Sequence, residues 1–302
     1  MKKITIIIPL DPQKKLEDLD LNINKKKADI VIVRGNNPSK NRNDGIKKSK
    51  TELVAFINAH TRLSNNWLGE VLEFFKENSA IDIVGGPQAG FEGGGLFSKS
   101  TDVALSSLFG SGGVRYRYAG KKIKLDADET DLTSANLICK RKIFERVKFD
   151  EMLYPGEDPK FISDAKKEGF KIAYSPKIIV YNQRRENLKL LAKQIYNYGK
   201  TRPQKESLFE TIKRPFFLAP SIFLIYLLFF PTLLFISYYL AIPLIIYLIT
   251  LFYFSVIGWI QEQKPKICLL LILIYPTIHI SYGLGFIISF IRRVFKNEKW
   301  VA

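Results

Sequence analysis

The first candidate for chemistry is a pair of polar side chains at the end of an apolar run. Residues 53–57 carry no charge, and Asn58 and His60 then present an amide and an imidazole two positions apart. Asn is common in turns, so the pair can simply mark a turn after a strand. Ligand sites in open α/β folds lie at the carboxyl ends of sheet strands, where such a pair would act as ligands. The strand alone favours the turn, and both interpretations stay open at this point.

The second candidate is a pair of adjacent acids, Glu157 and Asp158, in the segment GEDPKFISDAKKEG. A positioned carboxylate can take a proton from a hydroxyl group, so Asp158 is a candidate general base. The same acids stand just before a predicted helix start, where negative charge is favoured. An acid at a helix start with no catalytic role is the alternative, and the segment taken alone favours it.

The residues around these candidates predict an α/β domain over residues 1–183. Three β-branched runs, ITIIIPL, ADIVIVRG and LVAFINA, are typical of buried parallel strands. Helical stretches such as NWLGEVLEFFKENS alternate with the strands, which implies βαβ units and a mostly parallel sheet. Gly85 and Gly86 end a later strand and would let a ligand approach the backbone closely.

The last part of the chain, residues 215–302, predicts a transmembrane region. No charged residue occurs over 216–260 or over 267–291, and about 20 apolar residues cross a bilayer as a helix. The spans expected from these stretches are 216–236, 238–258 and 267–291. Basic residues stand on both sides of the first two spans, which places both sides in the cytoplasm.

The third expected span is interrupted by Pro276, His279 and two glycines. A broken, re-entrant helix would leave both of its ends in the cytoplasm and could line a polar cavity. An ordinary third span is the alternative. Residues 184–214 lead into this region and contain an amphipathic stretch at 187–198. We expect an interfacial helix there, with an ordinary surface helix as the alternative.

The net charge of +17, from 46 Lys and Arg against 29 Asp and Glu, suits a polyanionic partner. Nucleic acid, an anionic membrane surface and phosphate-rich substrates all fit that description. Beside membrane spans, a basic surface most simply faces the membrane, so no nucleic-acid partner is expected. Cys139 and Cys268 lie far apart in sequence and suggest neither a disulfide framework nor a zinc site.

The order of these segments resembles family 2 of the inverting glycosyltransferases, which have the GT-A fold. The matching segments are the first strand with Pro9, the RNDGI segment that begins at Arg42, the strand that ends in Asn58-Ala59-His60, and the acidic pair Glu157-Asp158. Two more segments, ALSSLFGSGGVRYR and SYGLGF, resemble the subgroup of membrane-bound exopolysaccharide glucosyltransferases such as the succinoglycan enzyme. The resemblance covers nearly the whole chain.

The resemblance implies a role for particular residues. Asp158, with Glu157 beside it, would supply the catalytic base. His60 would bind a divalent metal, Mn²⁺ or Mg²⁺, that stabilises the leaving diphosphate. The nucleotide-sugar donor would be bound by Pro9, Arg34, Arg42, Asn43 and Asn58, and the acceptor by Asp131, Asn136, Arg184 and Gln194. The family usually has Asp at the position of Asn58, so this chain departs from the pattern there.

These observations lead us to expect a multi-pass protein of the cell membrane with a cytoplasmic catalytic domain. It would transfer a sugar from a nucleotide-sugar donor, a UDP-sugar by preference, to a lipid-linked or polysaccharide acceptor. Two alternatives stay open. An inactive glycosyltransferase-like membrane scaffold would explain Asn58 in the metal motif, and a lipid-glycan transport subunit would explain a broken third span.

Overall fold

The computed structural model describes residues 3–14, 27–59, 61–91, 93–153, 156–205 and 208–295. Contacts divide the chain into two compact units, each described by itself below. The sheet unit comprises Met1–Phe91 and Gly113–Gln183, and the helical unit comprises Glu92–Gly112 and Arg184–Ala302. The segment around residues 93–112 therefore belongs with the C-terminal helices, although it interrupts the sheet unit in sequence. The predicted division into 1–183, 184–214 and 215–302 stays a prediction.

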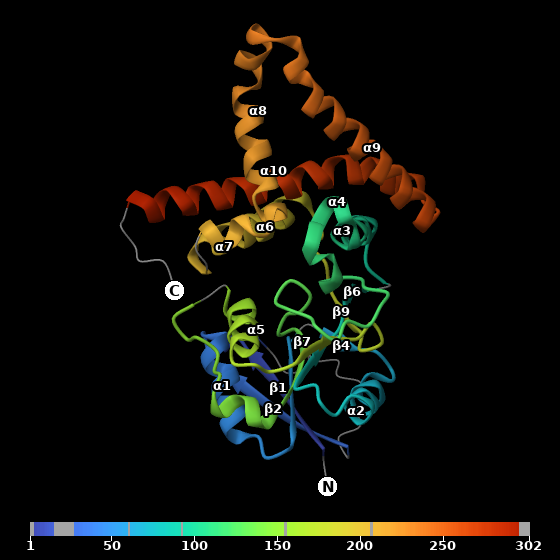
Figure 1. Cartoon of the computed structure of the whole chain (residues 1–302). Coiled ribbons are helices and arrows are strands. Elements are labelled where there is room, and N and C mark those ends of the chain that lie inside the picture. The colour runs from blue at the N-terminus through green and yellow to red at the C-terminus, as the bar shows by residue number, and fades with distance from the viewer. Residues whose placement is uncertain are drawn as a thin grey trace. The chain divides into compact units, whose positions relative to one another are not determined.

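A mixed six-stranded sheet forms the centre of the sheet unit (Figure 1). Its strand order is β2-β1-β3-β7-β5-β8. The strands are β1 (Ile4–Leu10), β2 (Ala28–Arg34), β3 (Leu53–Ile57), β5 (Ile83–Gly85), β7 (Asn136–Lys140) and β8 (Ile172–Tyr174). Strand β1 is parallel to β2 and β3, and β5 is parallel to β8, whereas β7 runs antiparallel to β3 and β5. The predicted α/β class is confirmed, and β7 is the strand that makes the sheet mixed.

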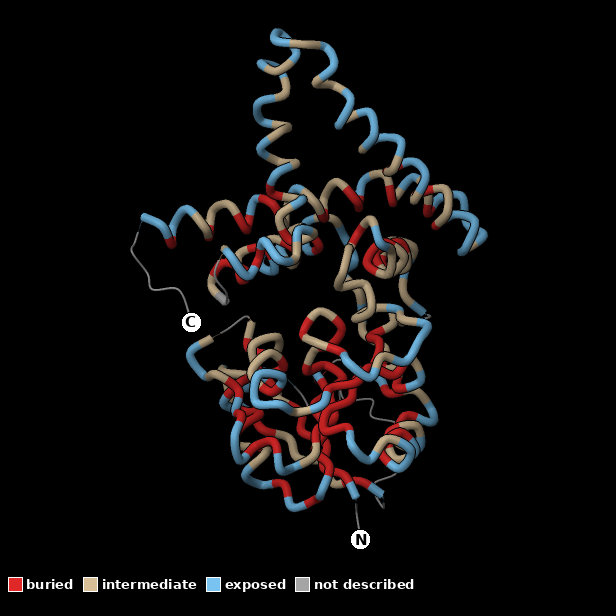
Figure 2. Tube along the Cα trace, in the orientation of Figure 1, coloured by how far each residue is buried: buried red, intermediate tan, exposed pale blue. Residues whose placement is uncertain are grey.

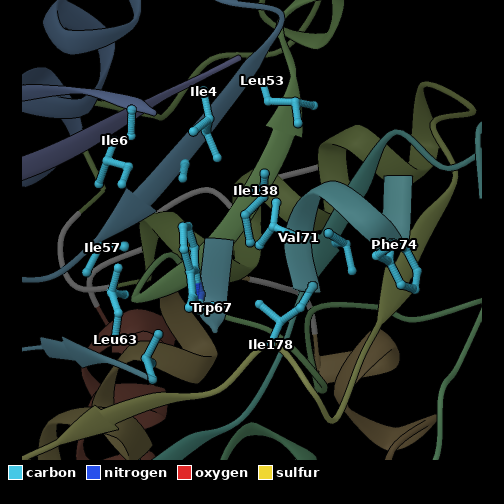
Figure 3. Close-up of a cluster of buried hydrophobic side chains, with 14 of the residues drawn as sticks. Ile4, Ile6, Leu53, Ile57, Leu63, Trp67, Val71, Phe74, Ile138 and Ile178 are labelled. Carbon is cyan, nitrogen blue, oxygen red and sulfur yellow. The ribbon is translucent and has the colours of Figure 1, made fainter. Parts of the chain in front are cut away.

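Helices cover both faces of this sheet because its inner strands are apolar on both sides. Successive side chains of a strand alternate between faces, so Ile6 of β1 joins one hydrophobic cluster and Ile7 joins the other. Helix α2 (Trp67–Glu77) packs on the first cluster, where Trp67 and Val71 lie among the strand residues (Figure 3). Helices α1 (Pro38–Lys48) and α5 (Glu157–Lys167) pack on the second cluster through residues such as Phe161.

A second, three-stranded sheet lies in the same unit, in the order β4-β9-β6. Its strands are β4 (Thr61–Leu63), β6 (Gln88–Gly90) and β9 (Val180–Asn182). The central strand β9 runs antiparallel to β4 and parallel to β6. Short 3₁₀-helices complete the described elements around this unit: η2 (Gly112–Arg117) and η3 (Arg141–Glu145).

Among the described residues of the helical unit, three helical segments are long and apolar enough to cross a membrane: Ala219–Ile236, Tyr238–Glu262 and Pro265–Phe295. The predicted spans 216–236, 238–258 and 267–291 fall on these helices. The unit contains α3 (Leu96–Ser106), α4 (Leu108–Ser111), α6 (Leu188–Lys205), α7 (Leu208–Ile212), η4 (Pro215–Phe217), α8 (Ala219–Ile236), η5 (Tyr238–Ala241), α9 (Ile242–Glu262) and α10 (Pro265–Phe295). Figure 2 shows α8 and α9 exposed along most of their length, in contrast to the buried strands of the sheet unit.

The last of these helices, α10, is continuous, so of the two alternatives for the third apolar segment the broken helix is wrong. Proline removes one backbone donor and crowds the preceding turn of a helix. In this helix the turn before Pro276 is held by packing, because Leu271 and Tyr275 are fully buried. The Tyr275 hydroxyl also donates to the Ser107 hydroxyl at 3.2 Å.

Helix α6 is longer than the stretch 187–198 that the sequence predicts, and one side of it packs closely on α10. A Cβ added at Gly199 would collide with the backbone of Tyr282, and one added at Gly285 would collide with the backbone of Tyr196. The two helices therefore meet backbone to backbone, as small residues allow.

Candidate active site

The most distinctive cluster of charged groups in the sheet unit joins α1 to the first turn of α5. The Arg42 Nη1 donates to Glu157 Oε1 at 2.9 Å and lies 3.6 Å from Asp158 Oδ1. The Arg42 and Glu157 side chains are only 5% and 7% exposed, whereas Asp158 is 21% exposed. The two adjacent acids thus share one guanidinium but differ in exposure: Glu157 is buried, and Asp158 is partly exposed.

Local sequence fixes where this cluster forms. Helix α1 starts at Pro38 after Asn37, whose side chain accepts a hydrogen bond from the Lys40 amide and so caps the helix. Helix α5 starts after Gly156, which has a φ of 121° that non-glycine residues rarely adopt. Both acids consequently lie in the first turn of α5, where the helix dipole stabilises negative charge.

The electrostatics of Glu157 follow mainly from its burial. Burial, and after it the neighbouring charge of Asp158, raise the pKa of its carboxyl group to about 7, against the lowering effect of Arg42. Its Oε2 accepts a hydrogen bond from the Gly156 amide at 3.0 Å. Glu157 is therefore fixed in place by Arg42 and Gly156, which leaves Asp158 as the carboxylate that a bound molecule can reach.

A serine that the sequence analysis did not single out holds Asp158 in place. The Ser134 hydroxyl donates to Asp158 Oδ1 at 2.5 Å, and the Ser134 amide donates to Oδ2 at 3.2 Å. Two donors from one residue fix the plane of the carboxylate, and hydrogen bonds to an ionised acceptor are among the stronger ones. The only sequence signal was the position of Ser134 between Asp131 and Asn136 in DLTSAN.

A chain of hydrogen-bonded polar side chains crosses the small sheet toward this cluster. The Thr61 hydroxyl donates to Asn182 Oδ1 at 2.6 Å, and the Asn182 amide donates to Gln88 Oε1 at 2.7 Å. The Gln88 amide in turn donates to the Thr133 hydroxyl at 2.5 Å. Thr133 precedes Ser134, the residue that binds Asp158. The beginning of β4 and the acidic pair are thus connected by one polar network.

The residue that starts the first candidate pair, Asn58, is exposed directly after β3. Its carbonyl accepts a hydrogen bond from the Thr61 amide at 3.1 Å, which closes a turn. His60 lies outside the described residues. Its predicted role as a metal ligand, and its predicted convergence with Asp158 on one crevice, therefore stay predictions.

The described residues alone do not fit a metal centre. No group of three His, Cys, Asp or Glu side chains that could hold a metal occurs among them. Asn58 offers an amide oxygen where a carboxylate would bring negative charge, and Mg²⁺ and Mn²⁺ prefer sites with carboxylate ligands.

Three predicted donor-binding residues occupy positions around the carboxyl end of β1 and the α1 helix. Pro9 lies on β1 beside Val33 of β2. The Arg34 guanidinium donates to the carbonyl oxygens of Pro12 and Lys14, at 3.3 and 2.7 Å. It thereby fixes the chain that follows β1. Contact of Pro9 and Arg34 with a donor stays a prediction.

The third of these residues, Asn43, is buried, and both the nitrogen and the oxygen of its side-chain amide form hydrogen bonds. Its nitrogen donates to the Phe149 carbonyl and to Glu151 Oε1, both at 2.9 Å, and its oxygen accepts from the Phe149 amide at 3.1 Å. These bonds tie α1 to the segment before α5. Asn43 thus helps to position Arg42 and the acidic pair, and its contact with a donor stays a prediction.

The predicted acceptor residues of the sheet unit are both buried and bound internally. Asp131 forms an ion pair with Lys124 at 2.5 Å. Asn136 accepts a hydrogen bond from the Trp67 indole at 3.0 Å and donates to the Ile178 carbonyl at 2.7 Å. These contacts give both residues a structural role, and their contact with an acceptor stays a prediction.

Arg184 and Gln194 belong to the helical unit. Arg184 forms a largely buried ion pair with Asp102 at 2.6 Å. The Gln194 amide donates to the Tyr198 hydroxyl at 2.9 Å. Their predicted roles in acceptor binding stay predictions, because they are described in a different unit from Asp158.

Gly85 and Gly86, at the end of β5, allow neighbouring segments of the protein backbone to pack closely. A Cβ at Gly85 would collide with the carbonyl of Asn136 and the side chain of Leu132. A Cβ at Gly86 would collide with the carbonyls of Ile178 and Ser175. The space that the sequence suggested for a ligand is therefore filled by neighbouring strands and turns.

A family model described as Glycosyl transferase family 2 matches residues 14–148. This range is less than half of the chain; it contains Arg42, Asn58 and Ser134 and ends before the acidic pair at the start of α5. No curated protein matches the chain.

Solved structures resemble the chain at low identity. Residues 1–349 of TarS from S. aureus, in complex with UDP-GlcNAc, show 16% identity and a TM-score of 0.45 over 65% of this chain and 67% of that chain. A longer TarS structure shows 16% identity and a TM-score of 0.44 over 65% of this chain, which spans only 40% of that chain. A197 from STIV shows 16% identity and a TM-score of 0.42 over 62% of this chain and 87% of that chain. Similarity at this level carries no argument about activity.

Proposed function

We propose that this chain is a membrane-bound inverting glycosyltransferase. It would take a sugar from a nucleotide-sugar donor, preferably a UDP-sugar, and transfer it to a lipid-linked or polysaccharide acceptor. The observation that carries the proposal is the arrangement of Asp158, which is solvent-accessible, bound by Ser134 and adjacent to a buried Arg42–Glu157 pair. The family match over residues 14–148 supports it. Membership of the exopolysaccharide subgroup is part of the same proposal.

In the proposed reaction, an acceptor hydroxyl oxygen forms a bond to the anomeric carbon of the sugar. The bond from that carbon to the diphosphate oxygen breaks on the opposite face, and the diphosphate leaves with the electron pair. Asp158 accepts the hydroxyl proton, a contribution of roughly 10²–10⁴-fold for general-base catalysis. Ser134 binds both oxygens of Asp158 and so holds the carboxylate in one orientation, and the excess of basic residues in the chain suits the anionic donor.

Asp158 is the better base of the two acids because of its exposure: Ser134 binds both of its oxygens, but its side chain is 21% exposed, against 7% for Glu157. Glu157 is buried, and its two oxygens are bound by Arg42 and by the Gly156 amide. A group held in this way cannot reach a hydroxyl of a bound acceptor without breaking a buried ion pair. Glu157 and Arg42 therefore act as positioning residues that fix the start of α5.

If a divalent cation binds through His60, it would supply positive charge to the departing diphosphate. The long apolar helices supply the membrane attachment, and a lipid-linked acceptor would come from that membrane. We place the sheet unit in the cytoplasm, because nucleotide sugars are made there and both sides of the α8–α9 segment carry basic residues.

The proposal is tested by turnover of a panel of UDP-sugars by the full chain in lipid nanodiscs, with and without Mn²⁺. We expect Asp158→Asn to lower the rate at least about 100-fold. The matched control is Asp164→Asn on the same helix, whose carboxylate pairs with Lys160 at 2.6 Å, and it should retain nearly the full rate. Equal rates in the wild type and Asp158→Asn would overturn the proposal.

The second candidate is an inactive glycosyltransferase-like scaffold, which the amide of Asn58 favours. In that case the wild type should bind UDP but show no turnover with any donor of the panel, and Asn58→Asp should not create any. The transport alternative loses its motivation, because α10 is not broken.

A further inference from the structure

The three apolar helices of the helical unit form the sides of a triangle (Figure 1). The first turn of α8 packs on α10 where Gly283 faces Pro220, and the C-terminal part of α9 packs on α10 where Gly258 faces Leu271. Residues 271 and 283 lie about 18 Å apart along a helix with a 1.5 Å rise. The other ends of α8 and α9 are joined by the single turn η5. Helix α10 therefore runs across the base of the α8–α9 hairpin and cannot lie parallel to both of its helices.

The two faces of α10 differ in their surroundings. Leu269, Leu273, Ile280, Leu284 and Ile291 recur at intervals of four and seven residues, so they share one face of the helix. These five side chains are 39–67% exposed. The opposite face, which includes Leu271, Ile274, Ile278 and Ser289, is buried. An apolar stripe thus runs along nearly the whole length of α10 and contacts no other part of the described chain closely enough to be buried.

The buried face of α10 packs against α6, a helix with exposed lysines. Helix α6 crosses α10 at Gly199 and Gly285, and Arg293 of α10 donates to the Pro203 carbonyl. The exposed residues of α6 include Lys189 and Lys193. If α10 crossed a bilayer, α6 would be drawn with its lysines into the hydrocarbon core, where charged side chains are costly.

The opposite end of α10 is also attached to charged groups. Lys99 of α3 forms an ion pair with Glu262, the last residue of α9, at 2.5 Å. Asp102, also on α3, forms a second ion pair with Arg184. Charged groups therefore occur in the elements next to both ends of α10.

We infer that α10 is not a third span but a helix that lies along the membrane surface, with its apolar stripe in contact with the acyl chains of one leaflet. The α8–α9 hairpin alone then crosses into the bilayer. The occupant of the stripe is lipid rather than protein, because α8 and α9 pack on α10 at ends that also expose apolar side chains, among them Ile222 and Ile260. Lys264, Lys266 and Arg292 stand at the two ends of α10, where they suit anionic headgroups. This inference does not depend on the proposed reaction.

Spin-label depth measurements test the inference in vesicles of phosphatidylcholine and phosphatidylglycerol. Single cysteines replace Leu269, Leu273, Ile280, Leu284 and Ile291 in the full chain, after Cys139→Ala and Cys268→Ala. Power saturation with oxygen and a nickel complex then gives the depth of each label. We expect one shallow, nearly constant depth along α10. A depth that rises to a maximum near Ile280 and falls again would show a span and overturn the inference.

Helix α8 supplies the matched control series, with labels at Ile222, Ile225 and Leu228, which are also exposed. Their depth should increase with residue number. Equal exposure of these labels and the α10 labels to water would show that the helical unit does not enter the bilayer, and it too would overturn the inference.

Labelling with a membrane-impermeant maleimide gives an independent readout. It reports on which face of the vesicle a cysteine lies and does not depend on how deep α10 lies in the bilayer. Lys264→Cys and Arg292→Cys flank α10 and should react from the same face of sealed vesicles. Ser237→Cys, between α8 and η5, should be protected from reagent on that face. Reaction of the two flanking cysteines from opposite faces would overturn the inference.

Discussion

The sheet unit differs from helices α8 and α9 of the helical unit in which side chains are exposed. In the sheet unit, apolar strand residues such as Ile6 and Phe56 are fully buried, and the exposed positions are mostly charged. In α8 and α9 of the helical unit, large apolar residues such as Leu228 and Phe235 are 69% and 92% exposed. The residues buried in α8 and α9 are Ser221, Leu251, Ser255 and Gly258, three of which are small.

This difference is the one expected if the helices α8 and α9 lie in a membrane, as we propose, and the sheet unit lies in water. In water, burial of apolar surface drives folding, so the sheet unit encloses its apolar side chains. In lipid that driving force is absent, and helices associate through small residues that allow close packing. The same residue type should therefore respond differently to substitution in the two units, and paired substitutions can measure the contrast.

The largest expected contrast comes from deleting a phenylalanine ring. Phe161 of α5 is buried and stacks on Phe149 with ring centroids 4.2 Å apart. Phe161→Ala should lower the free energy of unfolding of the sheet unit by about 3–5 kcal/mol, because the cavity cannot be filled. Thermal unfolding of the full chain in detergent, followed by the fluorescence of Trp67, measures the change.

The paired control is Phe235→Ala in α8, whose ring is exposed. It should change the free energy of unfolding by no more than about 0.5 kcal/mol. Similar losses in the two variants would contradict the proposed difference between the units.

The second contrast places a charge at an exposed leucine. Leu228→Asp, in the middle of α8, should hinder membrane insertion, since Asp at the centre of a span costs about 2.5–3.5 kcal/mol. The fraction of protein that stays in the membrane after an alkaline carbonate wash measures this. Leu125 is 58% exposed in the sheet unit, and Leu125→Asp should leave that fraction unchanged. Loss of membrane attachment in both variants would show that the charge acts through misfolding.

The third prediction concerns the buried carboxyl of Glu157 and is specific to the sheet unit. Its pKa is raised from 4.5 to about 7, so the unfolded state loses this proton first as pH rises. The stabilisation from the protonated group is therefore complete below about pH 4.5 and is lost as pH rises through 7. At 1.36 kcal/mol per unit, the total is at most about 3 kcal/mol.

The measurement is the Tm difference between the wild type and Glu157→Gln from pH 5 to 8. This difference should fall as pH increases, because glutamine does not titrate. Glu145→Gln, at an exposed position of η3, is the control and should give a flat difference. A difference that grows with pH would contradict the raised pKa.

The smallest expected effect comes from a single buried hydrogen bond. Trp67→Phe removes the indole donor to Asn136, at 3.0 Å, and leaves the amide oxygen without it. The loss should be about 1–3 kcal/mol, measured by circular dichroism during heating. Trp259→Phe in α9, where the ring is partly exposed to the surroundings, should change the Tm little. A larger effect at Trp259 than at Trp67 would reverse the comparison.

Much of the fold could be predicted because burial leaves a clear pattern in the sequence. Strand β1 is apolar on both faces, and α2 places its apolar residues on one side, so both elements were predicted correctly. The direction of β7 was not predicted, since NLICK has the same pattern whichever way the strand runs. The sequence left a broken and a continuous α10 both open, because the packing around Leu271 and Tyr275 that supports Pro276 cannot be seen in local propensity.

The candidate site was harder to predict because its geometry depends on contacts between distant segments. The sequence pointed to Asp158 and to Arg42, but not to the ion pair between Arg42 and Glu157 across 115 positions. Ser134 has no distinctive pattern, since a serine in a turn is common. Whether His60 joins these residues stays a prediction.

The assignment of α3 and α4 to the helical unit has a consequence for how the chain must be made. The Ser107 hydroxyl and the Phe109 carbonyl bind Tyr275 and His279, residues that are synthesised 168 and 170 positions later. At roughly 5–20 residues per second, this interval lasts on the order of 10–30 s. During this interval α3 and α4 are present without the α10 residues that they contact. A chain truncated after Gln183 would lack those residues permanently, so α3 and α4 would have no partner in it.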